Sequence, residues 1–393
     1  MLYSIFIDLI DGHIKTDIVS RDIRVLIKTA GFASEYHEEI TVSSAAGFTV
    51  SGENGSWQSD AGEKQIFTAD SATFGSDGVL YLKAADGQFE ISGLQRARAS
   101  ETYEGRLEIR RTDEGLLLIN ELPLEQYLCG VVPSEMPSSY PAEALKAQAV
   151  CARTYAAKRM QERNASAFFA DVDDSVSYQV YNNIKNNERT DQAVSETKGK
   201  VLMRDGDLID ALYYSTSCGI QLSDNPSDEA VFCSLLSTRD EKAYEKEEPW
   251  YRWSVSFSLE ELTELVKTGW QEDFGAVTGM EVVSREPSGV IAALKISGEG
   301  GEFQVEGEYT IRKLLQTRNS PVTLQDGSTA PNLGMLPSAF FYLTPNYEKE
   351  VLTGYTLTGG GYGHGKGMSQ NGAKHMADAG HKCADILRYY YAE

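Results

Sequence analysis

The sequence predicts an α+β fold with a mixed, β-rich core. Short β-branched runs separated by Gly-, Ser- and Asn-rich turns fill residues 23–110, and similar runs recur between 249 and 347. Between these regions, residues 142–163 are rich in alanine and other strong helix formers, which predicts one long helix. Strands and helices that are segregated along the chain favour an α+β arrangement, here with a second, smaller β-rich insertion or domain.

The shorter elements follow from local pattern. Ser258 suits the cap of the helix that follows it, and Ser288-Gly289 suits a hairpin turn. Alternating or β-branched runs predict strands, and apolar residues at helical spacing predict helices. Strands are expected at 23–27, 40–44, 48–50, 79–82, 89–91, 107–110, 201–202, 209–214, 253–257, 282–283, 293–296, 303–305 and 355–358, with short helices at 191–198, 259–267 and 309–315.

The length of 393 residues allows two or three domains or one elaborated core. We expect four segments. Residues 1–100 form an N-terminal β-rich segment, and residues 101–240 form a core that contains the long helix. Residues 241–346 form a second mixed β-rich segment, and residues 347–393 supply a glycine-rich loop and C-terminal helices that close the core.

Composition and charge limit the class of protein. With 41% hydrophobic and 24% charged residues the chain has the composition of a globular protein. A formal net charge of −22, without any basic run, argues against a nucleic-acid partner, because phosphate binding relies on clustered Lys and Arg. The five cysteines are scattered and form neither a disulfide framework nor a C-x-x-C metal pair.

The sequence predicts no membrane-spanning helix, because no apolar run approaches the roughly eighteen residues that such a helix requires. The opening stretch MLYSIFIDLI is apolar but short, lacks a basic leader and contains Asp8. These features argue against a complete signal peptide.

One glutamate stands out by its setting. An apolar run from Leu122 to Val132 ends at Pro133, and a second proline, Pro137, follows two residues after Glu135. Each proline fixes its own φ and biases the preceding residue toward extended geometry, so we expect a stiff, non-helical corner. A carboxyl group that is held still and has its pKa set by its surroundings suits a general acid. The alternative is a glutamate that caps the next helix or lies in solvent.

Two basic residues follow on the long helix. Lys146 and Arg153 are seven positions apart, which is two turns, so they project from the same face. Their side chains could reach the same cleft as Glu135.

These residues carry a resemblance to a known family. Residues 131–137 read V-V-P-S-E-M-P, and residues 143–155 read E-A-L-K-A-Q-A-V-C-A-R-T-Y. Both resemble the signature of the SpoIID sporulation-protein family, whose members are lytic transglycosylases of bacterial peptidoglycan or relatives called amidase enhancers. The resemblance implies that Glu135 is the catalytic acid and that Lys146 and Arg153 line the active site.

A hydroxyl-rich turn follows the strand expected at 209–214. Without the resemblance, residues 215–219, S-T-S-C-G, predict only a turn, although such a turn suits hydrogen bonding to sugars. The family carries a similar Y-S-T-S-x-G stretch, which makes Tyr214, Ser215 and Ser217 candidate substrate contacts.

Two acidic stretches are expected to be exposed. In some relatives a histidine and cysteines that precede a Q-V-Y sequence bind zinc, but residues 171–181 contain neither His nor Cys, so we expect no metal and no cofactor. The remainder of a calcium-binding loop is missing around Asp171, Asp173 and Asp174. We therefore expect a solvated acidic turn at these residues. Residues 240–248 are predicted to form an exposed acidic connection.

Six glycines occur between residues 359 and 367, which indicates close backbone approach or positive φ. A Walker loop fails at Gly367, where a Ser or Thr is needed. A zinc site formed by His364, His375, His381 and Cys383 fits no familiar ligand spacing.

The family ends similarly, with G-H-G-x-G-M-S-Q before a last helix. This resemblance implies that His364 and Gln370 line a glycan cleft opposite Glu135. Ser369 either contacts substrate or caps the terminal helix.

The function implied by the resemblance is lytic cleavage of the MurNAc-GlcNAc bond in peptide-free glycan strands by a single glutamate. The alternative is a non-catalytic protein that enhances an N-acetylmuramoyl-L-alanine amidase, and a purely structural wall-binding module is a third possibility. The expected partners are peptidoglycan strands and, under the alternative function, a cell-wall amidase. The expected location is outside the cytoplasm, at the cell envelope or the boundary of a spore-forming compartment. The acidic charge suits an uncharged glycan better than a polyanion.

Overall fold

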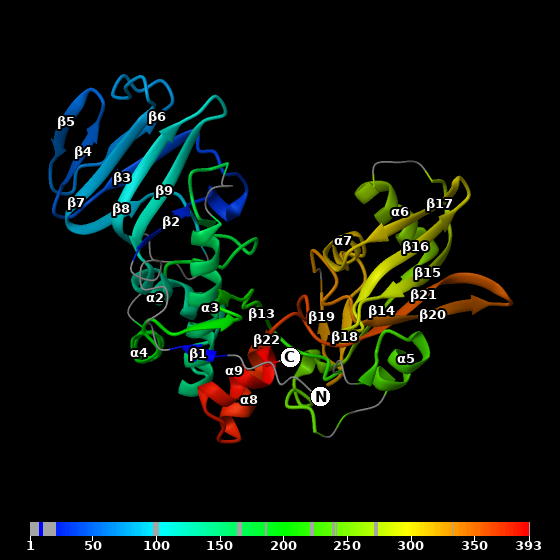
Figure 1. Cartoon of the computed structure of the whole chain (residues 1–393). Helices are drawn as coiled ribbons and strands as arrows, with labels where there is room; N and C mark the ends of the chain where they lie inside the picture. The colour runs from blue at the N-terminus through cyan, green and yellow to red at the C-terminus, as the bar shows by residue number, and fades with distance from the viewer. Residues whose placement is uncertain are drawn as a thin grey trace. The chain divides into compact units, whose positions relative to one another are not determined.

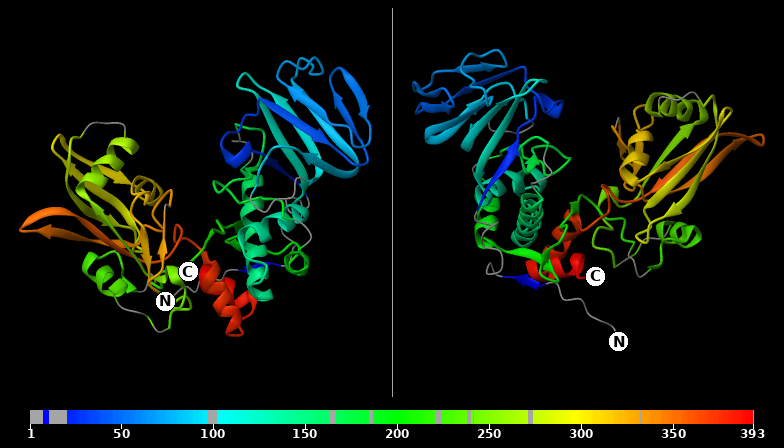
Figure 2. Two further views of the ribbon diagram at one scale, coloured as in Figure 1. Left: turned by 180° about the vertical axis from the view of Figure 1, so that it is seen from behind. Right: turned by 45° about the horizontal axis from the view of Figure 1, so that its top comes forward.

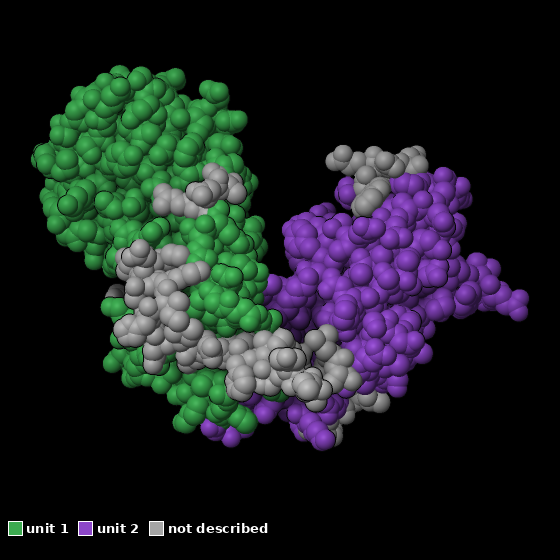
Figure 3. All heavy atoms as spheres, viewed as in Figure 1, with its two compact units in different colours: residues 1–211, 381–393 green, residues 212–380 purple. Residues whose placement is uncertain are grey.

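The computed structural model describes residues 8–10, 21–96, 102–162, 167–184, 187–220, 224–237, 240, 242–270, 274–331 and 333–392. It confirms the predicted α+β class, with mixed sheets and separate helices (Figure 1). The chain packs into two compact units, one formed by residues 1–211 with 381–393 and the other by residues 212–380 (Figure 3). The four expected segments do not coincide with these units, because strands before and after residue 100 share one sheet and the terminal helix returns to the first unit.

The first unit is built on a nine-stranded sheet in the order β10-β2-β9-β8-β7-β3-β6, with β4 paired to β7 and β5 paired to β4. Alternating burial along β7 places one face of the sheet on the core, as period-two strands require. The strands are β2 (Asp22–Leu26), β3 (Glu39–Ser43), β4 (Phe48–Gly52), β5 (Gly55–Ser59), β6 (Gln65–Thr68), β7 (Val79–Ile91), β8 (Thr102–Arg111), β9 (Leu116–Pro123) and β10 (Val172–Asp173).

Helices gather beyond one end of this sheet (Figure 2). They are α2 (Leu124–Glu135), α3 (Ala142–Gln161), α4 (Glu188–Glu196) and α9 (Cys383–Tyr391), beside a small sheet of β1 (Asp8–Ile10), β11 (Val201–Arg204) and β12 (Asp207–Leu208). The predicted alanine-rich helix is α3, and every residue from 147 to 157 is buried because α2, α4, α9 and β11 pack around it. Small side chains allow this close approach on all sides.

The second unit contains a five-stranded sheet in the order β19-β18-β14-β21-β20, a three-stranded sheet β15-β16-β17 and a parallel pair β13-β22. Its strands are β13 (Tyr213–Tyr214), β14 (Trp253–Ser258), β15 (Val277–Arg285), β16 (Ile291–Gly298), β17 (Gly301–Glu306), β18 (Val322–Leu324), β19 (Thr329–Ala330), β20 (Phe341–Glu348), β21 (Val351–Gly359) and β22 (Met368–Ser369). Its helices are α5 (Glu229–Ser237), α6 (Leu259–Trp270), α7 (Glu308–Leu314) and α8 (Gln370–Asp378).

The predicted non-helical corner at Glu135 is wrong. Strand β9 passes directly into α2, which contains Pro133 and ends at Glu135. A proline inside a helix costs roughly 3 kcal/mol. The buried face of α2, which consists of Leu124, Tyr127, Leu128, Val131 and Val132, stabilises the helix by roughly 1.5–3 kcal/mol for each side chain. Burial therefore outweighs the loss of one helical hydrogen bond.

Several smaller expectations also differ from the structure. The acidic residues 171, 173 and 174 are buried rather than solvated, and so is Glu245 in the expected exposed connection. The expected strand 209–214 contributes only β13 to a sheet, and Ser369 caps α8 instead of the last helix. The long helix ends at Gln161, and Arg163 and residues 1–7 of the opening stretch lie outside the described residues. No described helix combines the length and apolar character needed to cross a membrane.

Candidate functional site

Glu135 lies at the end of α2, where a neighbouring loop holds its side chain. The backbone N–H of Val180 donates to Glu135 Oε1 at 2.6 Å. A second hydrogen bond joins the same loop to the residue before Glu135, since the N–H of Asn182 donates to Ser134 Oγ at 3.1 Å. The hydrogen bond from the Val180 backbone holds the Glu135 carboxylate in place. Because Glu135 is only half-buried, part of its surface stays accessible. This combination suits a carboxyl group that must meet a substrate in one orientation.

The loop that binds Glu135, residues 174–183, is itself firmly anchored. Asp174 lies in a buried ion pair with Arg96, with 2.6 Å between Oδ2 and Nη2. Burial raises the pKa of Asp174 to about 6, against the opposing effect of Arg96. Asp173 Oδ1 accepts hydrogen bonds from both the N–H and the hydroxyl of Ser175. The acidic turn was expected to be solvated, but its buried carboxylates instead fix the loop that binds Glu135.

Gln179 ties the same loop to both helices. Tyr127 of α2 donates its hydroxyl proton to Gln179 Oε1 at 3.4 Å, and Gln179 Nε2 donates to the carbonyl of Ala152 in α3 at 3.3 Å. Glu135 is one of the negative groups that, after burial itself, raise the pKa of Tyr127. The Tyr127 hydroxyl therefore stays protonated and serves as a donor in this network.

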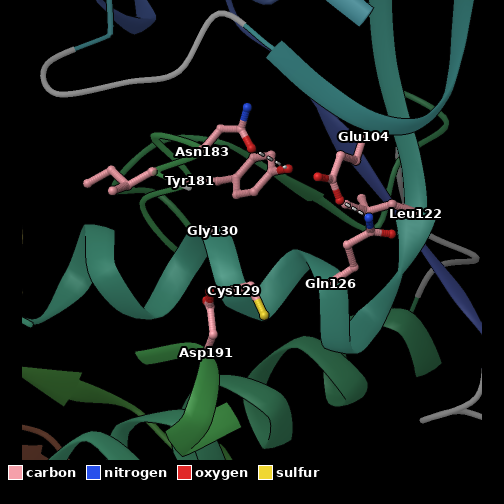
Figure 4. A pocket seen from close by; sticks show the side chains of 9 residues that line it. Glu104, Leu122, Gln126, Cys129, Gly130, Tyr181, Asn183 and Asp191 are labelled. Atoms are coloured by element: carbon pink, nitrogen blue, oxygen red, sulfur yellow. Dashed lines mark hydrogen bonds between the residues drawn. The ribbon is translucent and has the colours of Figure 1, made fainter. Parts of the chain in front are cut away.

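The ring of Tyr181 packs against α2 at Gly130 (Figure 4). A Cβ added to Gly130 would lie 2.5 Å from a ring carbon of Tyr181, so only glycine allows this contact. Beside it is a cavity of about 200 Å³ whose lining includes Glu104, Gln126, Cys129 and Asp191. Burial raises the pKa of the Cys129 thiol to about 12, so Cys129 is not poised as a nucleophile.

Gly130→Ala is expected to destabilise the protein by about 1–3 kcal/mol, because the new methyl group displaces Tyr181. In an ordinary exposed helix the same change stabilises by up to about 1 kcal/mol, so the sign of the effect is diagnostic. Denaturant unfolding measures it. Gly334→Ala is the control, since a Cβ there meets no atom within 4 Å. A Gly130→Ala protein as stable as wild type would contradict the close packing.

The two predicted basic residues bind other carboxylates. Lys146 Nζ lies 2.6 Å from Glu196 Oε2 and 3.1 Å from Glu143 Oε1, and it is partly exposed. Arg153 has no exposed side-chain surface and binds Glu125 through two hydrogen bonds of 2.8 Å. Arg153 thus joins α3 to α2 inside the fold, whereas Lys146 retains a surface that a ligand could touch.

The remaining predicted site residues come together in the second unit. Strands β13 and β22 pair in parallel, which sets Tyr213 opposite Met368 and Tyr214 opposite Ser369. The ring of Tyr214 lies 5.6 Å from the ring of His364. Positive φ at Gly363 and Gly365 allows the chain to pass tightly here, because a Cβ on either would clash with Tyr214 or Phe340.

His364 is fixed through both ring nitrogens. Its Nδ1 accepts from the N–H of Lys366 at 3.0 Å, so Nε2 carries the proton and donates to the carbonyl of Tyr213 at 3.1 Å. Burial lowers the pKa of His364, which favours this neutral form. Among the described residues, no cluster of three His, Cys, Asp or Glu side chains could hold a metal ion.

Ser369 is completely buried. Its Oγ accepts from the N–H groups of Gly372 and Ser217 at 3.1 and 3.2 Å, and it forms a hydrogen bond with Glu245. These contacts correspond to the capping alternative rather than to substrate contact. Tyr214, Ser215, Ser217, His364 and Gln370 are half-buried and keep surface that a ligand could reach.

Glu245 provides a test of this buried network. Burial raises the pKa of its carboxyl from the ordinary 4.5, against the hydrogen bond with Ser369, and its Oε1 has no hydrogen-bond partner in the described structure. The folded state therefore keeps this proton to a higher pH than the unfolded chain, and stability falls as pH rises above about 4.5.

Glu245→Gln is expected to flatten this pH dependence between about pH 4.5 and the folded-state pKa. Denaturant unfolding at a series of pH values measures the slope. Glu247→Gln, at an exposed position two residues away, should keep the wild-type slope. Equal slopes for the Glu245 variant and wild type would show that the buried carboxyl is already ionised.

Comparison with known proteins places these features in a family. A model of the stage II sporulation protein family, SpoIID, matches residues 112–203. Stage II sporulation protein D of Bacillus subtilis (strain 168) is 31% identical over 288 residues, which cover 70% of this chain and 74% of that protein. Its counterpart in Bacillus amyloliquefaciens is 30% identical over 289 residues, with the same two coverages. The chain belongs to the SpoIID family.

The family match also has a clear limit. The amidase enhancer of Bacillus subtilis (strain 168) is 32% identical over 289 residues, but these span only 39% of that protein. A second model, a domain of unknown function named DUF8618, matches residues 208–367 and nearly coincides with the second unit. In this SpoIID protein, Glu135 and its loop thus lie within the family match, and Tyr214 and His364 lie within the second one.

Sequence reasoning missed several residues that support the candidate site of this SpoIID protein. An isolated glycine inside an apolar helical pattern is a recognised sign of close packing, and it could have identified Gly130. No sequence signal identifies the Val180 N–H, because every residue except proline carries one. Glu125 and Glu245 are two of 58 acidic residues, and only tertiary contacts distinguish them, because Glu125 binds the buried Arg153 and Glu245 is itself buried.

Proposed function

We propose that this SpoIID protein is a peptidoglycan lytic transglycosylase and that Glu135 serves as both its acid and its base. The observation that carries the proposal is the fixed and partly accessible carboxylate, held by the Val180 N–H at 2.6 Å. A hydrolase of glycosidic bonds normally needs two carboxyl groups, whereas an intramolecular transfer needs only one. The two basic residues that match the family signature are engaged by other carboxylates, so Glu135 does not depend on them for its position.

The reaction balances with one carboxyl group. Protonated Glu135 gives its proton to the oxygen that links MurNAc C1 to GlcNAc, and the C1–O bond breaks to leave a free GlcNAc 4-hydroxyl. The carboxylate then accepts the proton of the MurNAc 6-hydroxyl as that oxygen attacks C1. The product carries a 1,6-anhydroMurNAc end, Glu135 is protonated again, and no water is consumed.

Partly exposed residues are the proposed substrate contacts. In the first unit Lys146 retains exposed surface, and in the second unit Tyr214, Ser215, Ser217, His364 and Gln370 do so. Hydroxyl and amide groups of this kind suit the hydroxyls and acetamido groups of a glycan. We assign Arg153 and Ser369 to the stability of the fold, because neither has exposed surface.

Digestion of peptide-free glycan strands by the purified protein tests the activity. Mass spectrometry should find fragments one water lighter than hydrolysis products, with anhydro ends. Hydrolytic ends in their place would indicate a different reaction, and intact strands would contradict the enzymatic proposal.

A second candidate is a non-catalytic enhancer of an N-acetylmuramoyl-L-alanine amidase, which the similarity to a relative named amidase enhancer favours. Its test is a pull-down and an assay of amidase rate with and without this protein. Stimulation that is unchanged by Glu135→Gln, together with intact glycan strands, would support the enhancer function. In both cases we place the protein outside the cytoplasm at the cell envelope, in contact with peptidoglycan.

A further inference from the structure

The loop that binds Glu135 also carries an exposed aromatic side chain. Tyr178 is 42% exposed, two residues before the Val180 N–H that binds the Glu135 carboxylate. Tyrosine buries its large apolar ring readily, so an exposed ring two residues before the N–H that binds a candidate catalytic group needs an explanation.

Burial alternates from Tyr178 to Tyr181. Gln179 is buried and points into the fold, where it contacts Tyr127 and the Ala152 carbonyl. Tyr178 is exposed and Val180 is half-buried, so both flank a residue that faces inward.

The Tyr178 backbone is held in place. Its N–H donates to the Ser175 carbonyl at 3.1 Å, and Ser175 is fixed by two hydrogen bonds to Asp173. On the other side, Tyr181 N–H donates to the Asp174 carbonyl at 3.1 Å. The ring is therefore carried by a loop whose backbone is fixed by hydrogen bonds. Because the backbone is already ordered, little conformational entropy would be lost when a ligand covers the ring.

A second tyrosine interacts electrostatically with the first. Tyr155 of α3 is nearly buried, with the Arg159 guanidinium 4.8 Å from its ring centre. The Tyr178 phenol is one of the groups that, after burial itself, raise the pKa of Tyr155. The Tyr178 phenol thus lies within electrostatic range of a tyrosine on α3.

We propose that Tyr178 is a stacking platform for one sugar ring of a glycan strand, forming a binding subsite next to Glu135. The apolar C–H face of a pyranose can cover the aromatic ring, while its hydroxyls stay hydrated at the edges. The inference rests on the proposed function, and it names a specificity residue that the family signature does not include.

The test measures binding separately from cleavage. Peptide-free oligosaccharides of alternating GlcNAc and MurNAc are titrated calorimetrically into the Glu135→Gln protein, which holds strands without cutting them. Adding Tyr178→Ala should raise Kd about tenfold, and Tyr178→Phe should stay within about twofold of the parent because the ring is kept. Tyr81→Ala is the matched control, since Tyr81 is 48% exposed on β7 of the same unit.

The outcomes distinguish the subsite from the reaction. Equal Kd values for the parent, Tyr178→Ala and Tyr81→Ala overturn the platform, whatever the wild-type protein does to glycan strands. Binding that depends on Tyr178 without any anhydro product from wild type upholds the platform and overturns the enzymatic proposal. Absence of binding in the parent overturns both. Circular dichroism of each variant verifies folding, which substitution of an exposed side chain should not disturb.

Discussion

Glu135→Gln is expected to lower the rate of anhydro-product formation about 10³-fold, because an amide can neither donate nor accept the transferred proton. The substitution preserves side-chain shape, and the amide oxygen can still accept the Val180 N–H that holds Glu135 in the structure. Binding of glycan strands should therefore change little while turnover is lost. Quantitative mass spectrometry of anhydro ends against time gives the rate.

Glu162→Gln is the matched control for charge removal. Glu162 is exposed at the end of α3, where it pairs with Arg159, and its replacement should leave the rate unchanged. Glu135→Asp probes position instead, since one methylene less withdraws the carboxylate from the Val180 N–H. Anhydro products formed at the wild-type rate by Glu135→Gln would sink the assignment of Glu135 as acid and base.

Arg153→Ala is expected to destabilise the protein by about 3–5 kcal/mol, because it leaves buried partners of the guanidinium without a donor. Arg153 binds both carboxylate oxygens of Glu125 at 2.8 Å. It also donates to the carbonyls of Val194 and Lys200 at 3.2 and 3.3 Å. One side chain thus connects α2, α3 and the end of α4. Chemical denaturation of the purified variant measures the loss.

Two further substitutions sharpen this result. Arg153→Lys should recover only part of the stability, since an ammonium cannot form the two parallel bonds to Glu125. Arg388→Ala removes a solvent-exposed partner of Asp385 on α9 and should cost less than about 1 kcal/mol. An Arg153→Ala protein of wild-type stability that fails to bind glycan would instead support the active-site role implied by the family signature.

Local pattern predicted much of the fold because much of it is local. The strands at 23–27, 253–257 and 355–358 and the long helix appear close to their predicted positions. In each of them period, propensity and turn residues favour the same structure. The prediction failed at residues 124–135, where proline chemistry favoured a corner and burial of one apolar face favoured a helix.

The candidate site divides in the same way. The sequence alone identified three candidates, which are Glu135, Lys146 and the S-T-S turn. It could do so because a motif specifies both the residue types and the spacing between them. Accessibility could not be predicted, since it depends on what packs around each side chain. Arg153 and Ser369 proved to be internal supports, whereas Lys146 and His364 kept surface for a ligand.

By itself the sequence determined the α+β class, the SpoIID membership and the identity of the single glutamate on which the proposed chemistry depends. Only the tertiary structure decided that this glutamate ends a helix, that a backbone N–H from a loop 45 residues away holds it, and that Tyr178, two residues before that N–H, is exposed. Residue type and spacing are written along the chain, but hydrogen bonds between distant segments and the burial of side chains arise only when those segments pack together.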